Sequence, residues 1–287
     1  MNDVRDPIRA RQYRVIGQPI SHSLSPTIHQ MFAQELDINL NYEKAEVAPG
    51  ELAQALEKFA RFGVSGLNIT LPLKEEAIGL ASELTERARL AGAANTVVIK
   101  AAGDYLMDNT DGVGLIRDLS ANWQVDLLDK DILILGAGGA VRGVIFPLLA
   151  SRPRSIWIAN RTLTKAQSLV ALATDAGAGR NIDLTASDLQ GLTQTKFDIV
   201  INGTSLGVSG QVPGINAAIF ADTEFCYDMM YHKSGHTAFT RYANENGAPA
   251  SADGLGMLVE QAAEAFKLWH GVLPSTLPVI QAIRDTR

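Results

Sequence analysis

The chain has 287 residues, of which 46% are apolar and 20% are charged. This length is enough for about two domains that each bury a substantial core, and the composition excludes a largely disordered protein. The net charge is −6 and the basic residues are scattered, so charge gives no support to binding of nucleic acid or of an anionic membrane. The 25 glycines follow no fixed period, which argues against a collagen-like or repeat protein and suits an enzyme with many tight turns.

Cysteine content and apolar run length bear on the compartment. The single cysteine, Cys226, excludes an intrachain disulfide framework and a thiolate zinc cluster, which fits a reducing cytoplasm. Residues 1–14 contain four arginines with no apolar run behind them, so neither a secretory signal nor a membrane anchor is expected there. The longest apolar stretches, 132–141 and 143–150, are far shorter than the roughly 20 residues of a membrane span. We expect a soluble cytoplasmic protein.

Short β-branched runs alternate along the chain with segments of helical apolar spacing. The expected strands are 13–16, 40–47, 64–70, 96–99, 132–135, 156–159, 199–201 and 225–228. The expected helices are 27–36, 51–62, 75–80, 113–121, 140–150, 165–173, 237–246 and 258–269. This alternation predicts an α/β fold with mostly parallel sheets.

Two positions are candidate domain boundaries. One is the helix that begins near Asp111, because the apolar strand 132–135 behind it opens a new βαβ series. The other lies near Ala252-Asp253-Gly254, where the alternation stops and a long final helix begins. We predict domain segments 1–110, 111–253 and 254–287, with the last returning to the first domain and a cleft between the two domains.

A glycine-rich turn follows the expected strand 132–135 and leads directly into a helix. It reads Gly-Ala-Gly-Gly-Ala-Val-Arg-Gly over 136–143. Gly136 permits the tight turn, and Gly138 and Gly139 allow the backbone to approach a pyrophosphate at the helix N-terminus. Val141 stands where the simple fingerprint has its third glycine, and Gly143 is a candidate for the close helix-to-strand contact instead. The sequence therefore predicts a Rossmann-type dinucleotide site in 111–253, against the alternative of a turn that binds nothing.

The end of the next strand bears on the choice of dinucleotide. A carboxylate there would bind the ribose 2′-hydroxyl of NAD, whereas arginine would pair with the 2′-phosphate of NADP. Here 156–159 is followed by Asn160, Arg161 and Thr162, then by Lys165, with no carboxylate. NADP is therefore favoured, and the alternative is that both cations belong to a solvated helix start, where the helix dipole disfavours them without an anion to face.

Seven motifs occur in an order that resembles the NADP-dependent shikimate dehydrogenase family, from Tyr13 to about Pro278. They lie at 20–26 (Ile-Ser-His-Ser-Leu-Ser-Pro), 68–74 (Asn-Ile-Thr-Leu-Pro-Leu-Lys), 91–96 (Ala-Gly-Ala-Ala-Asn-Thr), 108–112 (Asp-Asn-Thr-Asp-Gly), 136–143, 160–162 and 252–257 (Ala-Asp-Gly-Leu-Gly-Met). The resemblance implies a substrate domain in 1–110 together with 254–287, an NADP domain in 111–253, and hydride transfer between NADPH and 3-dehydroshikimate on the pathway to chorismate and aromatic amino acids.

The resemblance also implies site residues. Lys74 and Asp111 would be catalytic and would also contact the substrate. The other implied substrate contacts are Ser23, Ser25, Thr70, Asn95, Tyr231 and Gln261. The implied cofactor contacts are Gly136, Ala137, Gly138, Gly139, Ala140, Asn160, Arg161, Thr162, Lys165, Thr204, Met229, Gly254 and Met257.

Each of these residues has a simpler structural interpretation that the sequence leaves open. The serines are candidate helix caps, Tyr231 is a candidate core residue, and Lys74 is a candidate surface lysine. Asp111 is a candidate N-cap, Gln261 a residue of an exposed helix face, and the segment of Gly254, Gly256 and Met257 a loop-to-helix turn with a core methionine. The family pattern has alanine at Gly203, and smaller residues than Val141 are usual in the glycine turn.

Rival functions also stay open. One is a quinate/shikimate dehydrogenase that uses NAD or NADP, and the other is a non-catalytic protein that binds shikimate or NADPH. We expect a small-molecule substrate and no metal, since Gly235 interrupts any helix that would bring His232 and His236 together. The oligomeric state is not determined by the sequence, and a homodimer stays open.

Overall fold

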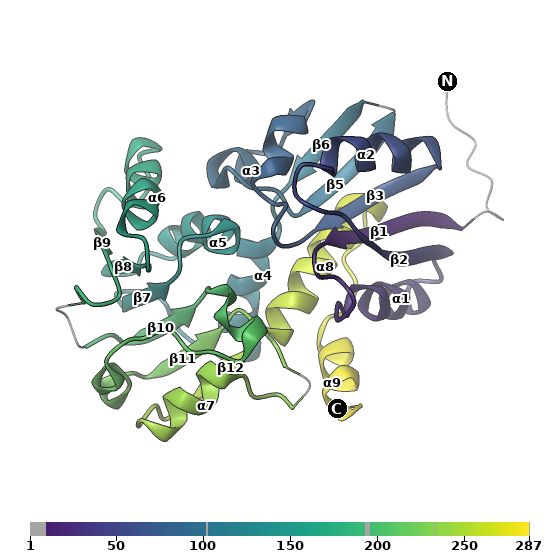
Figure 1. Ribbon diagram of the computed structural model, residues 1–287. Coiled ribbons are helices and arrows are strands. Elements are labelled where there is room, and N and C mark those ends of the chain that lie inside the picture. The colour runs from purple at the N-terminus through teal and green to yellow at the C-terminus, as the bar shows by residue number, and fades with distance from the viewer. Residues whose placement is uncertain (1–9, 102, 193–195, 233, 287) are drawn as a thin grey trace. The chain divides into compact units, whose positions relative to one another are not determined.

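The computed structural model describes residues 10–101, 103–192, 196–232 and 234–286; the N-terminal segment for which the sequence predicts no signal or anchor begins outside the described residues. The chain divides into two compact units, Met1–Thr110 with Gln261–Val279 and Asp111–Glu260 with Ile280–Arg287. Each unit contains a six-stranded sheet covered by helices, so the predicted two-domain α/β architecture with mostly parallel sheets is confirmed (Figure 1).

The sheet of the first unit is mixed. Its strands are β1 (Arg11–Gly17), β2 (Leu40–Glu46), β3 (Val64–Ile69), β4 (Glu83–Leu84), β5 (Thr96–Ala101) and β6 (Asp104–Asp108), in the order β2-β1-β3-β5-β6-β4. Strand β1 runs parallel to its neighbours β2 and β3, whereas β5 runs antiparallel to both of its neighbours. The end of β3, the start of β5 and the end of β6 consequently meet at one edge of the sheet.

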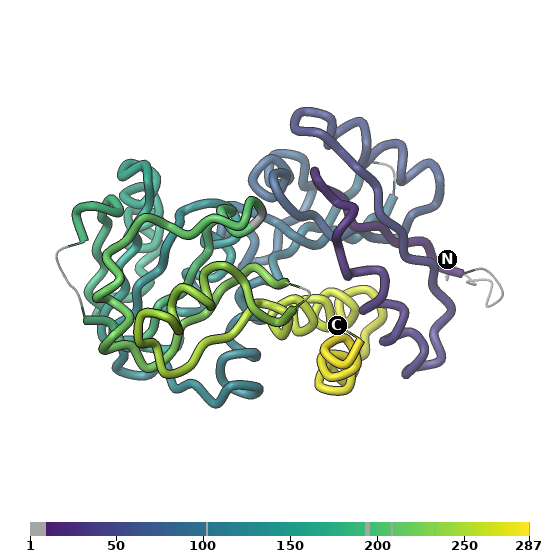
Figure 2. Tube along the Cα trace, turned by 60° about the horizontal axis from the view of Figure 1, so that its bottom comes forward, coloured from purple at the N-terminus to yellow at the C-terminus, as the bar shows by residue number. Residues whose placement is uncertain are grey.

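Helices cover both faces of this sheet. They are α1 (Ser25–Glu35), α2 (Leu52–Arg61), the 3-10 helix η1 (Glu76–Leu80), α3 (Glu86–Ala91) and residues 261–270 of α8 (Leu255–His270). Successive residues of a strand point to opposite faces. Ile16 accordingly packs in the core beneath α2, whereas the ring of Tyr13 stacks on Trp269 of α8 at 4.6 Å between centroids. Figure 2 shows this C-terminal segment running beside the N-terminal strand and helix.

The second unit has a fully parallel sheet. Its strands are β7 (Asp131–Leu135), β8 (Ser155–Ala159), β9 (Asp183–Ser187), β10 (Ile199–Asn202), β11 (Phe225–Asp228) and β12 (Ser251–Asp253). The order β9-β8-β7-β10-β11-β12 is that of a doubly wound dinucleotide-binding sheet, in which the direction of progression reverses between β7 and β10. Ligands of such sheets bind at the carboxyl ends of the strands beside that reversal.

Two helical layers cover this second sheet. Ile132 and Ile134 share a core with α4 (Asp111–Arg117), α5 (Gly139–Ala150) and α6 (Leu163–Asp175). Leu133 and Leu135 point to the opposite face, where η4 (Ala217–Asp222) and α7 (Ala238–Glu245) cover them. Further short elements are the π-helical turn η2 (Asp118–Asn122), the 3-10 helix η3 (Ser205–Ser209) and the terminal helix α9 (Leu277–Asp285).

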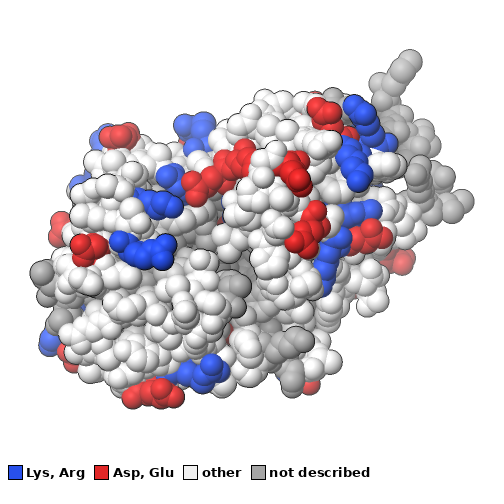
Figure 3. All heavy atoms as spheres, viewed as in Figure 1, with Lys and Arg blue, Asp and Glu red and all other residues white. Residues whose placement is uncertain are grey.

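The expected helices differ from the observed ones at two points. The segment expected as a helix over 75–80 forms the 3-10 helix η1, and the helix expected over 113–121 changes to a π-helical turn after Arg117. In the described part of the chain, no helix has the combination of length and apolar character required for a membrane span. On the face seen in Figure 3, acidic and basic side chains are intermingled.

Candidate active site

The loop after β1 carries the two predicted substrate serines. Ser25 is the first residue of α1 and is buried, and Ser23 Oγ lies 3.2 Å from Ser25 Oγ. Leu24 occupies the N-cap position and its own side chain makes no capping bond, but Ser23 Oγ accepts the Ser25 N–H at 3.3 Å. Ser23 therefore bonds the first N–H of the helix, as the capping interpretation expects, and the hydroxyl groups of both serines lie together beside the helix N-terminus.

The loop after β3 carries Thr70 and Lys74 next to the serine loop. The Thr70 N–H donates to the carbonyl of Ile16 at 2.9 Å, so this loop starts directly beside the end of β1. The side chain of Lys74 is half-buried. The backbone carbonyl oxygen of Lys74 accepts the Ala94 N–H at 2.8 Å. That second bond joins the lysine loop to the segment that carries Asn95.

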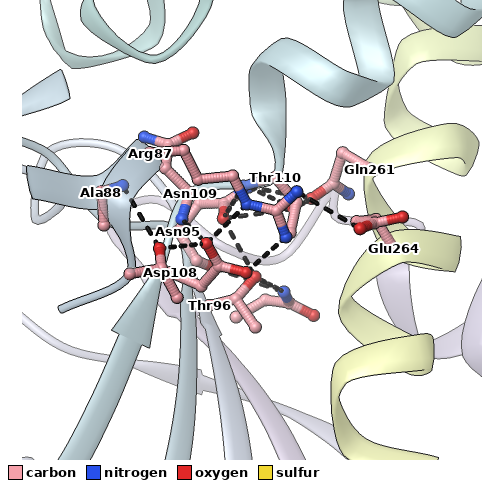
Figure 4. A network of polar contacts seen from close by, with 11 residues as sticks. Arg87, Ala88, Asn95, Thr96, Asp108, Asn109, Thr110, Gln261 and Glu264 are labelled. Atoms are coloured by element: carbon pink, nitrogen blue, oxygen red, sulfur yellow. Dashed lines mark hydrogen bonds and ion pairs between the residues drawn. The ribbon is translucent and has the colours of Figure 1, made fainter. Parts of the chain in front are cut away.

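Asn95 and Gln261 are buried and hydrogen-bonded to each other. The Asn95 Nδ2 group donates to Gln261 Oε1 at 3.1 Å and to Thr110 Oγ1 at 2.9 Å, and Asn95 Oδ1 accepts the Thr110 N–H at 2.9 Å (Figure 4). Since a backbone N–H can only donate, the orientation of the Asn95 amide is determined. Gln261 is 8% exposed, so the interpretation of an exposed helix face is wrong.

The amide pair continues into a chain of buried polar groups that sequence reasoning missed. Tyr42 donates to Asn68 Oδ1 at 2.7 Å, and Asn68 Nδ2 donates to Thr96 Oγ1 at 3.2 Å. Thr96 Oγ1 in turn donates to Asn95 Oδ1 at 2.9 Å. Asn68 opens the motif at 68–74, but nothing in the local pattern of Tyr42 indicates this contact.

Strand register explains why these residues collect at one edge of the first sheet. Asn68 near the end of β3 pairs with Thr96 at the start of β5, and Thr96 pairs with Asp108 at the end of β6. Asn95 therefore precedes β5 at the edge where the loop of Thr70 and Lys74 begins. Asp111 follows β6 by three residues as the first residue of α4 and is 3% exposed.

In the second unit, the glycine turn lies between β7 and α5, at the reversal of strand order. Gly136 has a φ of 109°, which disfavours any residue with a side chain. A Cβ on Gly138, the N-cap of α5, would meet no atom of the protein within 4 Å. The space in front of the helix N-terminus is thus open, and N–H groups and the helix dipole there suit a pyrophosphate. Residues 136–140 fit a dinucleotide on this observation.

The segment after β8 offers cations to that dinucleotide. Arg161 and Lys165 are exposed, and the Asn160 side chain donates to the Thr162 carbonyl at 2.9 Å, which shapes the turn. Residues 160–165 contain no carboxylate. This chemistry fits a 2′-phosphate rather than a free ribose 2′-hydroxyl.

Val141 and Gly203 form a matched pair. A Cβ on Gly203 would lie 2.5 Å from Val141 Cγ2 and 3.1 Å from Met229 Sδ. Val141 is fully buried and its side chain occupies the space that an alanine at position 203 would need. The two departures from the family pattern thus compensate each other. Gly143 makes its close contact with α4, because its carbonyl lies 2.6 Å from where a Gly112 Cβ would stand.

Asn202 and Asp228 shape the loops that carry Thr204 and Met229. Asn202 Oδ1 accepts the Thr204 N–H and hydroxyl, and its Nδ2 donates to Asp228 Oδ1 at 3.0 Å. The Met229 N–H donates to the Asn202 carbonyl at 2.9 Å. Burial raises the pKa of Asp228 to about 6, despite the hydrogen bonds that its carboxylate accepts from Asn202 Nδ2 and the Met230 N–H. Tyr231 follows in the same loop and is half-buried.

Packing within the second unit requires the two glycines before and within α8. A Cβ on Gly254 would lie 2.7 Å from the carbonyl carbon of Met229, and one on Gly256 would overlap the Asp118 carboxylate. Met257 is 6% exposed, lies in the core, and donates its N–H to Asp118 Oδ2 at 3.0 Å. The core-methionine interpretation therefore holds for Met257, whether or not its sulfur also reaches a cofactor.

Three family models match the chain. They are the shikimate dehydrogenase substrate binding domain over residues 15–97, shikimate / quinate 5-dehydrogenase over 119–207, and the shikimate 5'-dehydrogenase C-terminal domain over 254–284. A shikimate dehydrogenase (NADP(+)) of Colwellia psychrerythraea is 48% identical over 273 residues, which cover 95% of this chain and 96% of the relative. The chain belongs to the shikimate dehydrogenase family.

Solved structures of similar proteins share the fold over nearly the whole chain. An Ael1 enzyme from Pseudomonas putida is 39% identical with a TM-score of 0.84, covering 96% of this chain and 98% of that one. The shikimate 5-dehydrogenase of Thermus thermophilus, solved in complex with NADP(H) and shikimate, is 30% identical with a TM-score of 0.81, covering 96% and 100%. The segments matched to the shikimate dehydrogenase family contain every predicted site residue except Asp111, Met229 and Tyr231.

Proposed function

We propose that this member of the family is an NADP-dependent shikimate dehydrogenase, which reversibly reduces 3-dehydroshikimate to shikimate in the biosynthesis of chorismate and the aromatic amino acids. The observation that carries the proposal is the polar edge of the first sheet, where Ser23, Thr70, Lys74 and Asn95 lie on adjoining segments. A carboxylated ring with several hydroxyl groups requires such a row of hydrogen-bonding groups around one cation.

The substrate contacts follow from the chemistry of each group. The hydroxyls of Ser23, Ser25 and Tyr231 would donate to the substrate carboxylate. Thr70, Asn95 and Gln261 would bind the ring hydroxyls, and the Thr110 N–H fixes the orientation of the Asn95 amide. An analogue that lacks one ring hydroxyl would leave buried amide groups unsatisfied, which is the physical basis of selectivity.

NADPH, when bound, supplies the hydride, and the chain supplies its binding surface. Residues 136–140 would hold the pyrophosphate, while Asn160, Arg161, Thr162 and Lys165 would hold the 2′-phosphate. Thr204, Met229, Gly254 and Met257 would contact the nicotinamide end.

Lys74 and Asp111 would carry the proton transfer. In the reducing direction, the Lys74 ammonium would donate a proton to the substrate oxygen at C3 as that oxygen gains negative charge. Asp111 would hydrogen-bond the same hydroxyl and hold its position. In the oxidising direction, the neutral lysine amine would take the hydroxyl proton back.

The proposal assigns residues 1–110 and 254–287 to the substrate domain and residues 111–253 to the NADP-binding domain. We place the enzyme in the cytoplasm because its single cysteine, Cys226, allows no intrachain disulfide, which fits a reducing compartment. A homodimer is the oligomeric state we propose to test first, by light scattering of the purified protein.

An absorbance assay tests the function. Purified protein with shikimate and NADP+ should produce NADPH at 340 nm, and the reverse reaction with 3-dehydroshikimate should consume it. Quinate and NAD+ serve as the competing substrate and cofactor, and we expect each to give a kcat/KM lower by about tenfold or more. Absence of turnover with shikimate and NADP+ would refute the assignment, whereas turnover of quinate alone would favour the quinate enzyme.

A further inference from the structure

A partly buried ionic cluster lies behind the polar edge of the first sheet, and the side chain of its arginine, Arg87, is 32% exposed. The guanidinium of Arg87, on α3, contacts Asp108 at the end of β6 and Glu264 on α8 (Figure 4). The Arg87 Nε and Nη2 groups lie 2.6 Å and 2.5 Å from the two carboxylate oxygens of Asp108, and Nη1 lies 3.2 Å from Glu264 Oε1. One guanidinium therefore connects α3 and β6 to α8, which is far from both in the sequence.

Asp108 links Arg87 to Asn95 and to the turn before Asp111 through hydrogen bonds. Its side chain also accepts hydrogen bonds from Thr85 Oγ1 at 2.5 Å and from the Asn109 N–H at 2.7 Å, and its carbonyl accepts the Asn95 N–H at 2.9 Å. The Asp108 side chain is 1% exposed. Burial, the largest single effect, opposes ionisation, yet the bonds from Arg87, Thr85 and Asn109 together hold the pKa of Asp108 below its usual value.

Glu264 links Arg87 to the helix that carries Gln261. Glu264 and Gln261 are three apart on α8 and therefore share one face of the helix. The side chain of Glu264 is 12% exposed and faces Arg87, while Gln261 reaches Asn95. The bond between Arg87 and Glu264 is thus one of the contacts that orient this part of α8 relative to the Asn95 segment, together with the bond between Asn95 and Gln261.

The place of Arg87 on its own helix supports a role beyond solubility. Arg87 lies in the first turn of α3, where the helix dipole disfavours a cation. Arg89, on the same helix, forms an exposed pair with Glu86 and reaches no other element through that pair. Any exposed cation could form the pair at position 89. Position 87 requires the planar guanidinium of arginine, which contacts two carboxylates at once.

We propose that Arg87 is a positioning residue, which sets the geometry of Asn95 and Gln261 and of the turn before Asp111, and so controls productive binding of shikimate. The inference rests on the proposed function. Arg87 touches neither reacting group in this assignment and acts only through Asp108 and Glu264. Its loss displaces the groups that bind the ring hydroxyls and leaves the NADP segments of the second unit unaffected.

The test compares Arg87→Lys with Arg89→Met in steady-state assays against both substrates. Lysine keeps the charge but cannot contact both Asp108 oxygens and Glu264 at once. We expect kcat/KM for shikimate to fall about 10- to 100-fold in Arg87→Lys, with KM for NADP+ within about twofold of wild type. Arg89→Met, which removes an exposed cation of the same helix, should leave both values unchanged.

A second variant, Glu264→Gln, keeps the volume and the pair of Arg87 with Asp108 and weakens only the bond to α8. Glu264→Gln should lower kcat/KM for shikimate by less than Arg87→Lys does, again with little change in the KM for NADP+. If Arg87→Lys does not fold, this variant alone tests the proposal. A wild-type kcat/KM for shikimate in the folded variants would overturn the proposal. So would a KM for NADP+ that rises as much as the KM for shikimate. An inactive wild-type protein would instead refute the proposed function, so the two failures are distinguishable.

Discussion

Lys74 is the residue whose substitution tests the chemistry most directly. Lys74→Ala removes both the proton donor and the cation beside the developing alkoxide, so we expect kcat to fall about 10²- to 10⁴-fold with little change in KM. The measurement is the rate of shikimate oxidation at saturating NADP+. Lys100→Ala, which removes an exposed lysine paired with Glu83, is the control. Near-normal turnover of Lys74→Ala would exclude the assigned role.

A substitution of a second single residue, Arg161, tests the assignment of NADP as the cofactor. Arg161→Asp replaces the cation for the 2′-phosphate by a carboxylate that accepts from the ribose hydroxyl of NAD. We expect the ratio of kcat/KM for NADP+ over NAD+ to fall at least about tenfold, since a charge-assisted hydrogen bond contributes about 1.5–3 kcal/mol. Arg180→Asp, at an exposed position of the same unit, controls for the change in net charge. An unchanged ratio would contradict the 2′-phosphate role.

At the scale of elements, the start of α5 and the loop after β10 are coupled through Val141 and Gly203. Gly203→Ala forces a methyl group against Val141 Cγ2 and should cost about 1–3 kcal/mol in the free energy of unfolding. Val141→Ala leaves a cavity and should cost a similar amount. Because the second change makes room for the first, the double variant should be more stable than the sum predicts by about 1 kcal/mol or more in urea unfolding. Additive losses would show that the contact relaxes independently.

The elements that the sequence pattern predicted have either a β-branched apolar run or apolar residues at helical spacing. Strands such as β1, β3 and β7 and helices such as α2 and α5 lie close to their expected bounds. The elements it missed are β4, β6, β9, β12, α3, α9 and the 3-10 helices η3 and η4. They are short or partly polar; β12, for instance, has three residues and depends on its pairing with β11. Local propensity is weak for such segments, and neighbouring strands supply most of their stability.

At the scale of the whole molecule, α8 contributes residues to both compact units. Residues 255–260 belong to the second unit and 261–270 to the first, so unfolding of either unit removes part of one continuous helix. We therefore expect the two units to unfold in a single transition. Hydrogen exchange measured across a urea series should give β3 and β7 the same midpoint.

NADP+ extends this test to ligand binding. At about 100 times its Kd, NADP+ should stabilise the native state by about 2.7 kcal/mol. If the units unfold together, exchange in β3 should shift as far as exchange in β7, although we assign the cofactor to the second unit alone. Separate midpoints, or a shift confined to β7, would show that each unit unfolds independently.

The sequence by itself determined the α/β class, the glycine turn after a buried strand, the cations after the next strand and the family, because each depends on residues close together in the chain. Only the tertiary structure decided which distant side chains meet. Asn95 and Gln261 are 166 residues apart, and Arg87 lies 177 residues from Glu264. Val141 and Gly203 looked like two separate departures and proved to be one contact. Such pairs are specified by strand register and close packing in the folded core, and neither leaves a periodic signal in the sequence.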